Sequence, residues 1–100
     1  MIATHSVGSL LEEYKPGEFV LIDQIIDRTQ KRDLTYFDNA PTSWPGVCHT
    51  SFGDPYDIQL RDSVLAAAEQ ISFELHEEGT CIAIEGPRFS SRAEVSLKFQ

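Results

Sequence analysis

The feature that most constrains the fold is an amphipathic segment that leads, after a short polar stretch, into a brief apolar one. Across residues 57–75 the apolar side chains recur at intervals of three and four, which is the period of an α-helix with one apolar face. Gly79 suits a left-handed helix cap, and residues 80–84 have the length and composition of a buried strand. A helix that leads closely into a buried strand predicts a fold that mixes the two elements.

Other segments extend this prediction. Residues 18–23 follow a Lys-Pro-Gly turn and are rich in β-branched and aromatic side chains, so they predict another short buried strand. Residues 28–44 are polar and contain turn-forming residues, which predicts a long loop, and residues 91–94 predict the opening turn of a second helix. The alternation of strands and helices along the chain indicates the α/β class.

The charge balance limits the partners that the chain can bind. Its 100 residues carry 8 Lys and Arg against 16 Asp and Glu, a net charge of −8, and the basic residues are scattered. An excess of acid repels phosphate backbones and anionic lipid heads, so the sequence predicts neither a nucleic acid nor a membrane as partner. The sequence shows no leader and no apolar run long enough to cross a bilayer. This favours a location in the cytoplasm, with the nucleus as a second compartment.

Several kinds of chemistry lack their sequence motifs. His5, His49 and His76 are far apart, so no metal site is predicted. Cys48 and Cys81 are too few for a disulfide framework and are expected to be reduced thiols. The nucleophile elbow, the dinucleotide-binding glycine motif and the Walker loop are absent from the sequence. What remains is an N-terminal segment of small and hydroxyl-bearing residues, and a turn after the strand predicted at 80–84. Ligands in open α/β sheets bind at the carboxyl ends of the strands, where this turn lies.

This turn carries a family resemblance. Residues 85–94 read Glu-Gly-Pro-Arg-Phe-Ser-Ser-Arg-Ala-Glu, and this run resembles the methylthioadenosine phosphorylases, which are relatives of the purine nucleoside phosphorylases. Further matching segments occur in the order of the family, and they include residues 7–10, 22–29, 46–49 and 55–56. The resemblance covers about residues 3–94, whereas residues 95–100 diverge.

The resemblance implies an activity. These enzymes use inorganic phosphate to split 5′-methylthioadenosine into adenine and 5-methylthioribose 1-phosphate, within purine and methionine salvage. Phosphate is a co-substrate, and neither a metal nor an organic cofactor is implied. The family fold is a three-layer α/β structure with a mixed central sheet, and its subunits form homotrimers. Such chemistry depends on positioning and on fixed dipoles.

The resemblance also assigns candidate site residues. His5 and Ser6 fall at the segment that touches phosphate and ribose, although His5 departs from the usual smaller residue. His49 matches a histidine that reaches the 5′-substituent in a neighbouring subunit's site, and Phe89 matches the aromatic residue that stacks on the purine. Ser90 stands where the 6-oxopurine enzymes have a glutamate. A serine hydroxyl at this position favours a 6-aminopurine, because a glutamate would face the unprotonated N1 of adenine.

The length limits what this chain contains. The family subunit is far longer, so residues 1–100 are expected to form a partial phosphorylase domain that is incomplete at both ends. The resemblance places the general-acid aspartate outside this sequence, and no catalytic residue is assigned within it. Two alternatives stay open: a non-catalytic fragment or pseudoenzyme that binds purine or pairs with full-length subunits, and a phosphorylase for adenosine-like nucleosides.

Overall fold

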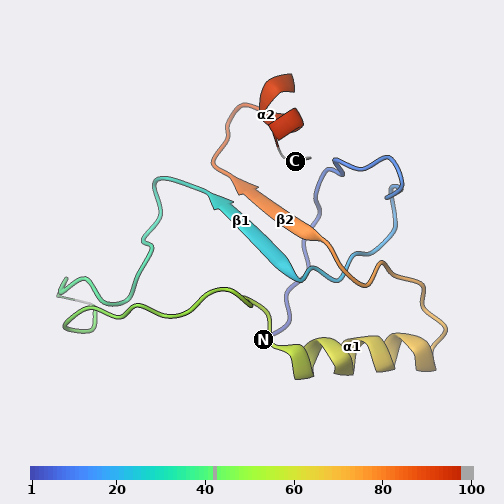
Figure 1. The fold of residues 1–100 in the computed structure, drawn as a ribbon, viewed down its shortest axis with the longest axis horizontal. Helices are drawn as coiled ribbons and strands as arrows, with labels where there is room; N and C mark the ends of the chain where they lie inside the picture. The colour runs from blue at the N-terminus through green and yellow to red at the C-terminus, as the bar shows by residue number, and fades with distance from the viewer. Residues whose placement is uncertain (42, 98–100) are drawn as a thin grey trace.

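The computed structural model describes residues 1–41 and 43–97. Along the chain the elements are strand β1 (Gln24–Arg28), helix α1 (Ile58–Gln70), strand β2 (Thr80–Ile84) and helix α2 (Arg92–Leu97). Figure 1 shows α2 near the arrowhead end of β2, and α1 on the other side of the strand pair. The predicted α/β class is confirmed. Residues 98–100, part of the tail that was expected to diverge, lie outside the described part.

The two strands pair in parallel, with Gln24 opposite Thr80 and Arg28 opposite Ile84. The pairing continues toward the N-terminus as an isolated parallel bridge between Val20 and His76. Around this bridge the Leu21 amide donates to the His76 carbonyl and the His76 amide donates to the Phe19 carbonyl, both at 2.8 Å. One register therefore runs along both segments, because each pair is offset by the same number of residues.

The strand predicted at residues 18–23 is wrong in its position, since the first strand begins at Gln24. Side chains interrupt the ladder before that residue. The Arg61 guanidinium donates to the carbonyls of Leu21, Ile22 and Glu77, at 3.1, 2.6 and 2.8 Å. The Asp23 carboxylate accepts the Gly79 amide at 3.1 Å. Residues 18–23 are thus held beside the second segment by side chains and by backbone hydrogen bonds, among them one from the Asp23 amide to the Gly79 carbonyl at 3.1 Å.

Gly79 lies in this interrupted stretch, and close packing explains why a glycine stands there. A Cβ atom at this position would lie 2.7 Å from Cγ1 of Val20, which is closer than real Cβ contacts. A side chain would push apart the two segments that lead into β1 and β2. The prediction that Gly79 caps the preceding helix is wrong.

Helix α1 is shorter than the predicted segment 57–75, and its own end explains the difference. Asp57 caps the start, with its carboxylate accepting the Leu60 amide at 2.8 Å. At the other end the Ser72 amide donates to the Glu69 carbonyl and the Phe73 amide to the Ala68 carbonyl. Ser72 adopts the left-handed conformation with φ 52°. This pattern is a Schellman motif, which closes the helix one turn before the apolar period ends.

The described residues enclose little core. Within residues 1–41 and 43–96, Ala68 is the one buried residue, at 9% exposure. The accessible surface is 9104 Å², whereas a compact monomer of this mass exposes about 5,700 Å². The radius of gyration is 16.7 Å, compared with about 13 Å for a compact chain of this length. The helices and strands therefore present open apolar faces.

None of the helices in the described part is long and apolar enough to span a bilayer.

Candidate functional site

Parallel pairing places the carboxyl ends of β1 and β2 at one edge of the strand pair. The loop after β1 and the turn after β2 leave from this edge (Figure 1). The Gln30 amide donates to the Glu85 carboxylate at 2.8 Å, which ties the two connections together. The Asp27 carboxylate accepts the Thr29 amide, also at 2.8 Å, and this hydrogen bond lowers the pKa of Asp27. This edge is therefore an ordered polar rim.

The turn from β2 to α2 is held by an ion pair. Gly86 begins it with φ 70°, a conformation that favours glycine. The Arg88 guanidinium donates two hydrogen bonds to the Glu94 carboxylate, at 2.8 and 3.0 Å. It donates a further one to the Phe89 carbonyl at 3.0 Å. Between these bonded groups the Phe89 side chain is 92% exposed.

The start of α2 completes this arrangement. Ser91 is the N-cap, with its hydroxyl accepting the Glu94 amide at 3.3 Å, while the Glu94 carboxylate accepts the Ser91 amide at 2.6 Å. These two reciprocal hydrogen bonds form a capping box, and the helix predicted to open at residues 91–94 is confirmed. The ion pair with Arg88 is the main cause of the lowered pKa of Glu94, and it also raises the pKa of Arg88.

The other candidate site residues lie on separate segments. His5 and Ser6 are exposed in an N-terminal segment without helix or strand, and His49 is exposed in the long connection between β1 and α1. Figure 1 shows this connection running away from the turn that leads to α2. Phe89 and the half-buried Ser90 share that turn. The structure thus groups the candidates as two pairs and one single residue, and it does not enclose them in one pocket.

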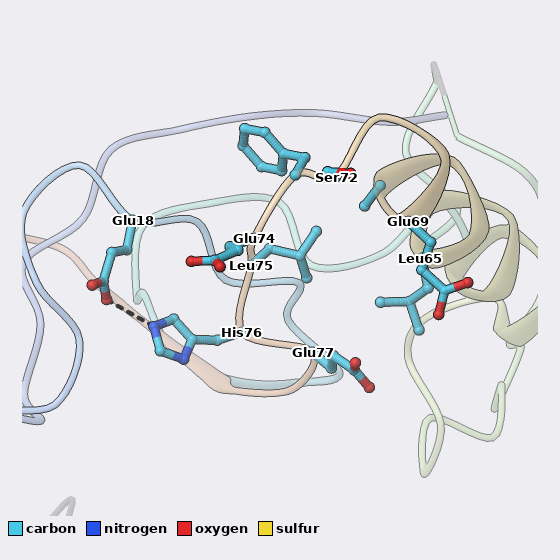
Figure 2. Close-up of a pocket in the computed structure, with 10 residues that line it drawn as sticks. Glu18, Leu65, Glu69, Ser72, Glu74, Leu75, His76 and Glu77 are labelled. Carbon is cyan, nitrogen blue, oxygen red and sulfur yellow. Dashed lines mark hydrogen bonds and ion pairs between the residues drawn. The ribbon is translucent and has the colours of Figure 1, made fainter.

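A shallow hollow lies elsewhere, between the end of α1 and residues 72–77. Figure 2 shows Glu18 and His76 facing each other at its rim, and the Glu18 carboxylate lies 2.8 Å from Nε2 of His76. Leu65 and Leu75 contribute apolar lining. A neighbouring hollow is lined by Tyr14, His76 and three glutamates. Neither hollow is lined by a residue predicted to bind substrate.

Within residues 1–41 and 43–97, no group of three or more His, Cys, Asp or Glu side chains is arranged to hold a metal ion. Cys48 is an exposed free thiol and Cys81 a half-buried one.

Two further residues of the turn, Arg88 and Glu94, are not among the site residues that the sequence predicts. The pattern Ser-x-x-Glu at residues 91–94 is a capping-box signature that identifies Glu94 as a residue folded back onto the turn. No local sequence pattern predicts the hydrogen bond from the Gln30 amide to the Glu85 carboxylate, because these residues are 55 positions apart.

Comparisons with known proteins identify relatives of this chain. The sequence model of the Phosphorylase superfamily matches residues 1–100. The S-methyl-5'-thioadenosine phosphorylase of Danio rerio is 49% identical over 100 residues, which are all of this chain and 35% of that protein. The enzyme of the same name from Pyrococcus furiosus is 49% identical over 94 residues, covering 94% of this chain and 35% of the relative.

Solved structures are similar too. Methylthioadenosine phosphorylase from Schistosoma mansoni in its apo form superimposes with a TM-score of 0.85 at 31% identity, over 92% of this chain and 38% of that one. A variant of the adenosine/methylthioadenosine phosphorylase from the same organism, in complex with methylthioadenosine, gives a TM-score of 0.82 at 31% identity. The superposition covers 38% of the chain in that structure and 92% of this chain.

The parallel strand pair with its flanking helices and ordered carboxyl edge is thus an α/β unit of the nucleoside phosphorylase kind. The chain belongs to the phosphorylase superfamily, and its curated relatives are methylthioadenosine phosphorylases. It spans about a third of the length of the relatives that it matches.

Proposed function

We propose that the full-length product of the gene encoding this chain splits 5′-methylthioadenosine with inorganic phosphate. A phosphate oxygen forms a bond to C1′ of the ribose as the bond from C1′ to N9 breaks, and the electron pair leaves with the adenine, which takes up a proton. The products are adenine and 5-methylthioribose 1-phosphate. The observation that carries this proposal is the 49% identity, over the whole chain, to a protein named for this activity.

The turn after β2 supports a purine as the ligand. Phe89 is 92% exposed and is held at its carbonyl, so its ring is available to cover a base. Stacking of an aromatic side chain on a base contributes about 1–3 kcal/mol. Ser90 follows directly, and its hydroxyl donates as well as accepts, which suits an adenine edge better than a carboxylate would.

The remaining site residues belong to the proposal as well. His5 and Ser6 would contact phosphate and ribose, where a serine supplies a hydroxyl and an amide. No organic cofactor or metal is required, and phosphate is the co-substrate. The general acid for the leaving adenine would come from outside residues 1–100, which form part of one domain. We place this reaction in the cytoplasm.

His49 would act across a subunit interface in a homotrimer. It lies in the long connection between β1 and α1, which also exposes the large apolar side chains of Tyr36, Trp44, Val47 and Phe52. Exposed apolar residues gathered on one segment are typical of a protein contact surface.

The test is phosphate-dependent release of adenine from methylthioadenosine by the full-length gene product, with its oligomeric state measured by light scattering in the same sample. We expect turnover by a trimer that requires phosphate. Phe89→Ala should raise KM for the nucleoside roughly 5- to 150-fold, which corresponds to the loss of about 1–3 kcal/mol of stacking. Phe37→Ala, a change of the same kind outside the turn, serves as the control.

The substrate comparison separates the alternatives. Preferential release of adenine from adenosine would move the assignment to adenosine-like nucleosides, a class that the name of one similar structure includes. A folded full-length product that releases no base from any nucleoside would contradict the proposal. It would leave the non-catalytic, purine-binding alternative.

A further inference from the structure

We propose that Arg88 and Glu94 are positioning residues, which together fix the turn that presents Phe89 and Ser90 to the purine. This inference rests on the proposed function for the identity of the ligand. Its structural part, the immobilisation of the turn by one ion pair, has a readout of its own.

The ion pair of Arg88 and Glu94 forms hydrogen bonds with both peptide groups that flank Ser90. On the preceding side, the Phe89 carbonyl accepts from the Arg88 guanidinium at 3.0 Å. On the following side, the Ser91 amide donates to the Glu94 carboxylate at 2.6 Å. Because the guanidinium and the carboxylate are bonded to each other twice, the two peptide planes are held relative to one another.

Both Arg88 and Glu94 extend from backbone that is itself restricted. Glu94 lies in the first turn of α2, where the capping box ties it to the N-cap Ser91. Arg88 follows Pro87, whose ring restricts the backbone at the beginning of the turn. The planar fork of the guanidinium matches a carboxylate through two parallel hydrogen bonds, which a lysine cannot make.

The exposure of the pair argues for a positioning role over a stabilising one. The Arg88 side chain is 70% exposed and that of Glu94 27% exposed. Exposed ion pairs contribute little to the stability of a protein. A fixed turn affects ligand binding instead, because a preorganised group loses less conformational freedom when a ligand binds. The backbone of Phe89 is fixed in this way, while its side chain is open to a ligand.

The experiment measures KM for methylthioadenosine, KM for phosphate and kcat in the full-length gene product. Arg88→Met removes the donors, and Glu94→Gln keeps the capping box, which accepts Gln as well as Glu, but loses the charged pair. We expect each variant to raise KM for the nucleoside about 2- to 12-fold, the range for ordering one side chain on binding. KM for phosphate should stay unchanged. Arg92→Met is the control for the loss of one positive charge nearby.

The exchanged variant Arg88→Glu/Glu94→Arg separates positioning from simple pairing. It restores opposite charges, but it sets a carboxylate beside the Phe89 carbonyl and a guanidinium beside the Ser91 amide. Positioning predicts that KM for the nucleoside stays as high as in the single variants. A return of that KM to the wild-type value would overturn the inference, as would single variants with an unchanged KM.

A second measurement keeps the inference separate from the proposed function. Amide NMR shifts and hydrogen exchange of Ser90 and Ser91 report the turn without any turnover. We expect both variants to shift these signals and to speed their exchange. If the wild type released no adenine, the proposed function would fail while this readout still tested the pair. Unchanged Ser90 and Ser91 amides in Arg88→Met and Glu94→Gln would overturn the inference.

Discussion

Glu18 and His76 join two segments that are 58 positions apart in the sequence. The Glu18 carboxylate lies 2.8 Å from Nε2 of His76, and it also accepts the Lys15 amide at 2.8 Å. The His76 ring lies 4.3 Å from the ring of Tyr14, between centroids. The hydrogen bond with His76 is the main reason why the pKa of Glu18 is lowered from its ordinary value of 4.5.

The lowered pKa of Glu18 leads to a pH prediction. A carboxylate whose pKa is lower in the folded state stabilises that state above its unfolded pKa, and this contribution is lost as the pH falls through the folded value. We therefore expect the carboxyl carbon of Glu18 to titrate below pH 4.5 in an NMR experiment. In His76→Phe, which keeps an aromatic ring beside Tyr14, the midpoint should return toward 4.5.

The control for this titration is His49→Phe, because His49 lies in the connection between β1 and α1, away from Glu18 in the sequence. Its Glu18 midpoint should equal that of the wild type. Equal midpoints in His76→Phe and the wild type would show that His76 does not perturb this carboxyl group.

Sequence patterns predicted single residues where the information was local. The helix opening at residues 91–94 was predicted, and Phe89 and Ser90 were correctly grouped on one turn after a strand. The pairs Glu18 with His76 and Glu85 with Gln30 were not predicted, because they join residues more than fifty positions apart. Whether His5, Ser6, His49, Phe89 and Ser90 bind substrate stays a prediction.

Arg61 decides how the elements are joined. It projects from α1, and its guanidinium bonds three carbonyls on the two segments that precede β1 and β2. The apolar pattern correctly predicted β2 at residues 80–84, but it placed the first strand at 18–23 and extended α1 to residue 75. Apolar periodicity contains no information on a guanidinium that bonds carbonyls of two segments or on a serine whose left-handed conformation ends a helix.

Replacing Arg61 should therefore loosen the junction of helix and strands. Arg61→Met leaves three carbonyls without this donor, and an unsatisfied polar group that is removed from water costs about 1–3 kcal/mol. We expect the free energy of unfolding of the full-length gene product, measured in urea, to fall by about that amount. Arg61→Lys should recover only part of it, since one ammonium group lacks the forked geometry.

Arg32→Met is the matched control, because Arg32 is exposed, and a change of less than about 0.5 kcal/mol is usual for such a residue. Equal unfolding free energies for Arg61→Met and Arg32→Met would show that the guanidinium does not hold the junction.

For the whole molecule, the open apolar faces are the dominant property. The chain exposes 9104 Å², which is well above the roughly 5,700 Å² of a compact monomer of this mass. Large apolar side chains contribute to this exposed surface, among them Ile58 in α1 and Ile71 and Phe73 in the segment that follows it. Such surface is typical of a part of a domain that packs against further elements or other chains.

The 100-residue chain produced alone should therefore bind apolar dyes and associate with itself. We expect it to enhance the fluorescence of anilinonaphthalene sulfonate far more than the full-length gene product does at equal mass concentration. Sedimentation velocity at two concentrations should show growth in size with concentration. A monodisperse monomer without dye binding would show that residues 1–100 close their own core.

The parallel register has a consequence for protein synthesis. Gln24 pairs with Thr80, so 80 − 24 = 56 residues must be added after β1 before its partner strand exists. At about 5–20 residues per second, a ribosome needs about 3–11 s for this step. Helix α1 is made within that interval and forms from local bonds, whereas β1 leaves the exit tunnel as an unpaired edge. The seconds after β1 leaves the tunnel are therefore the period in which it is open to chaperones and to pairing with other nascent chains.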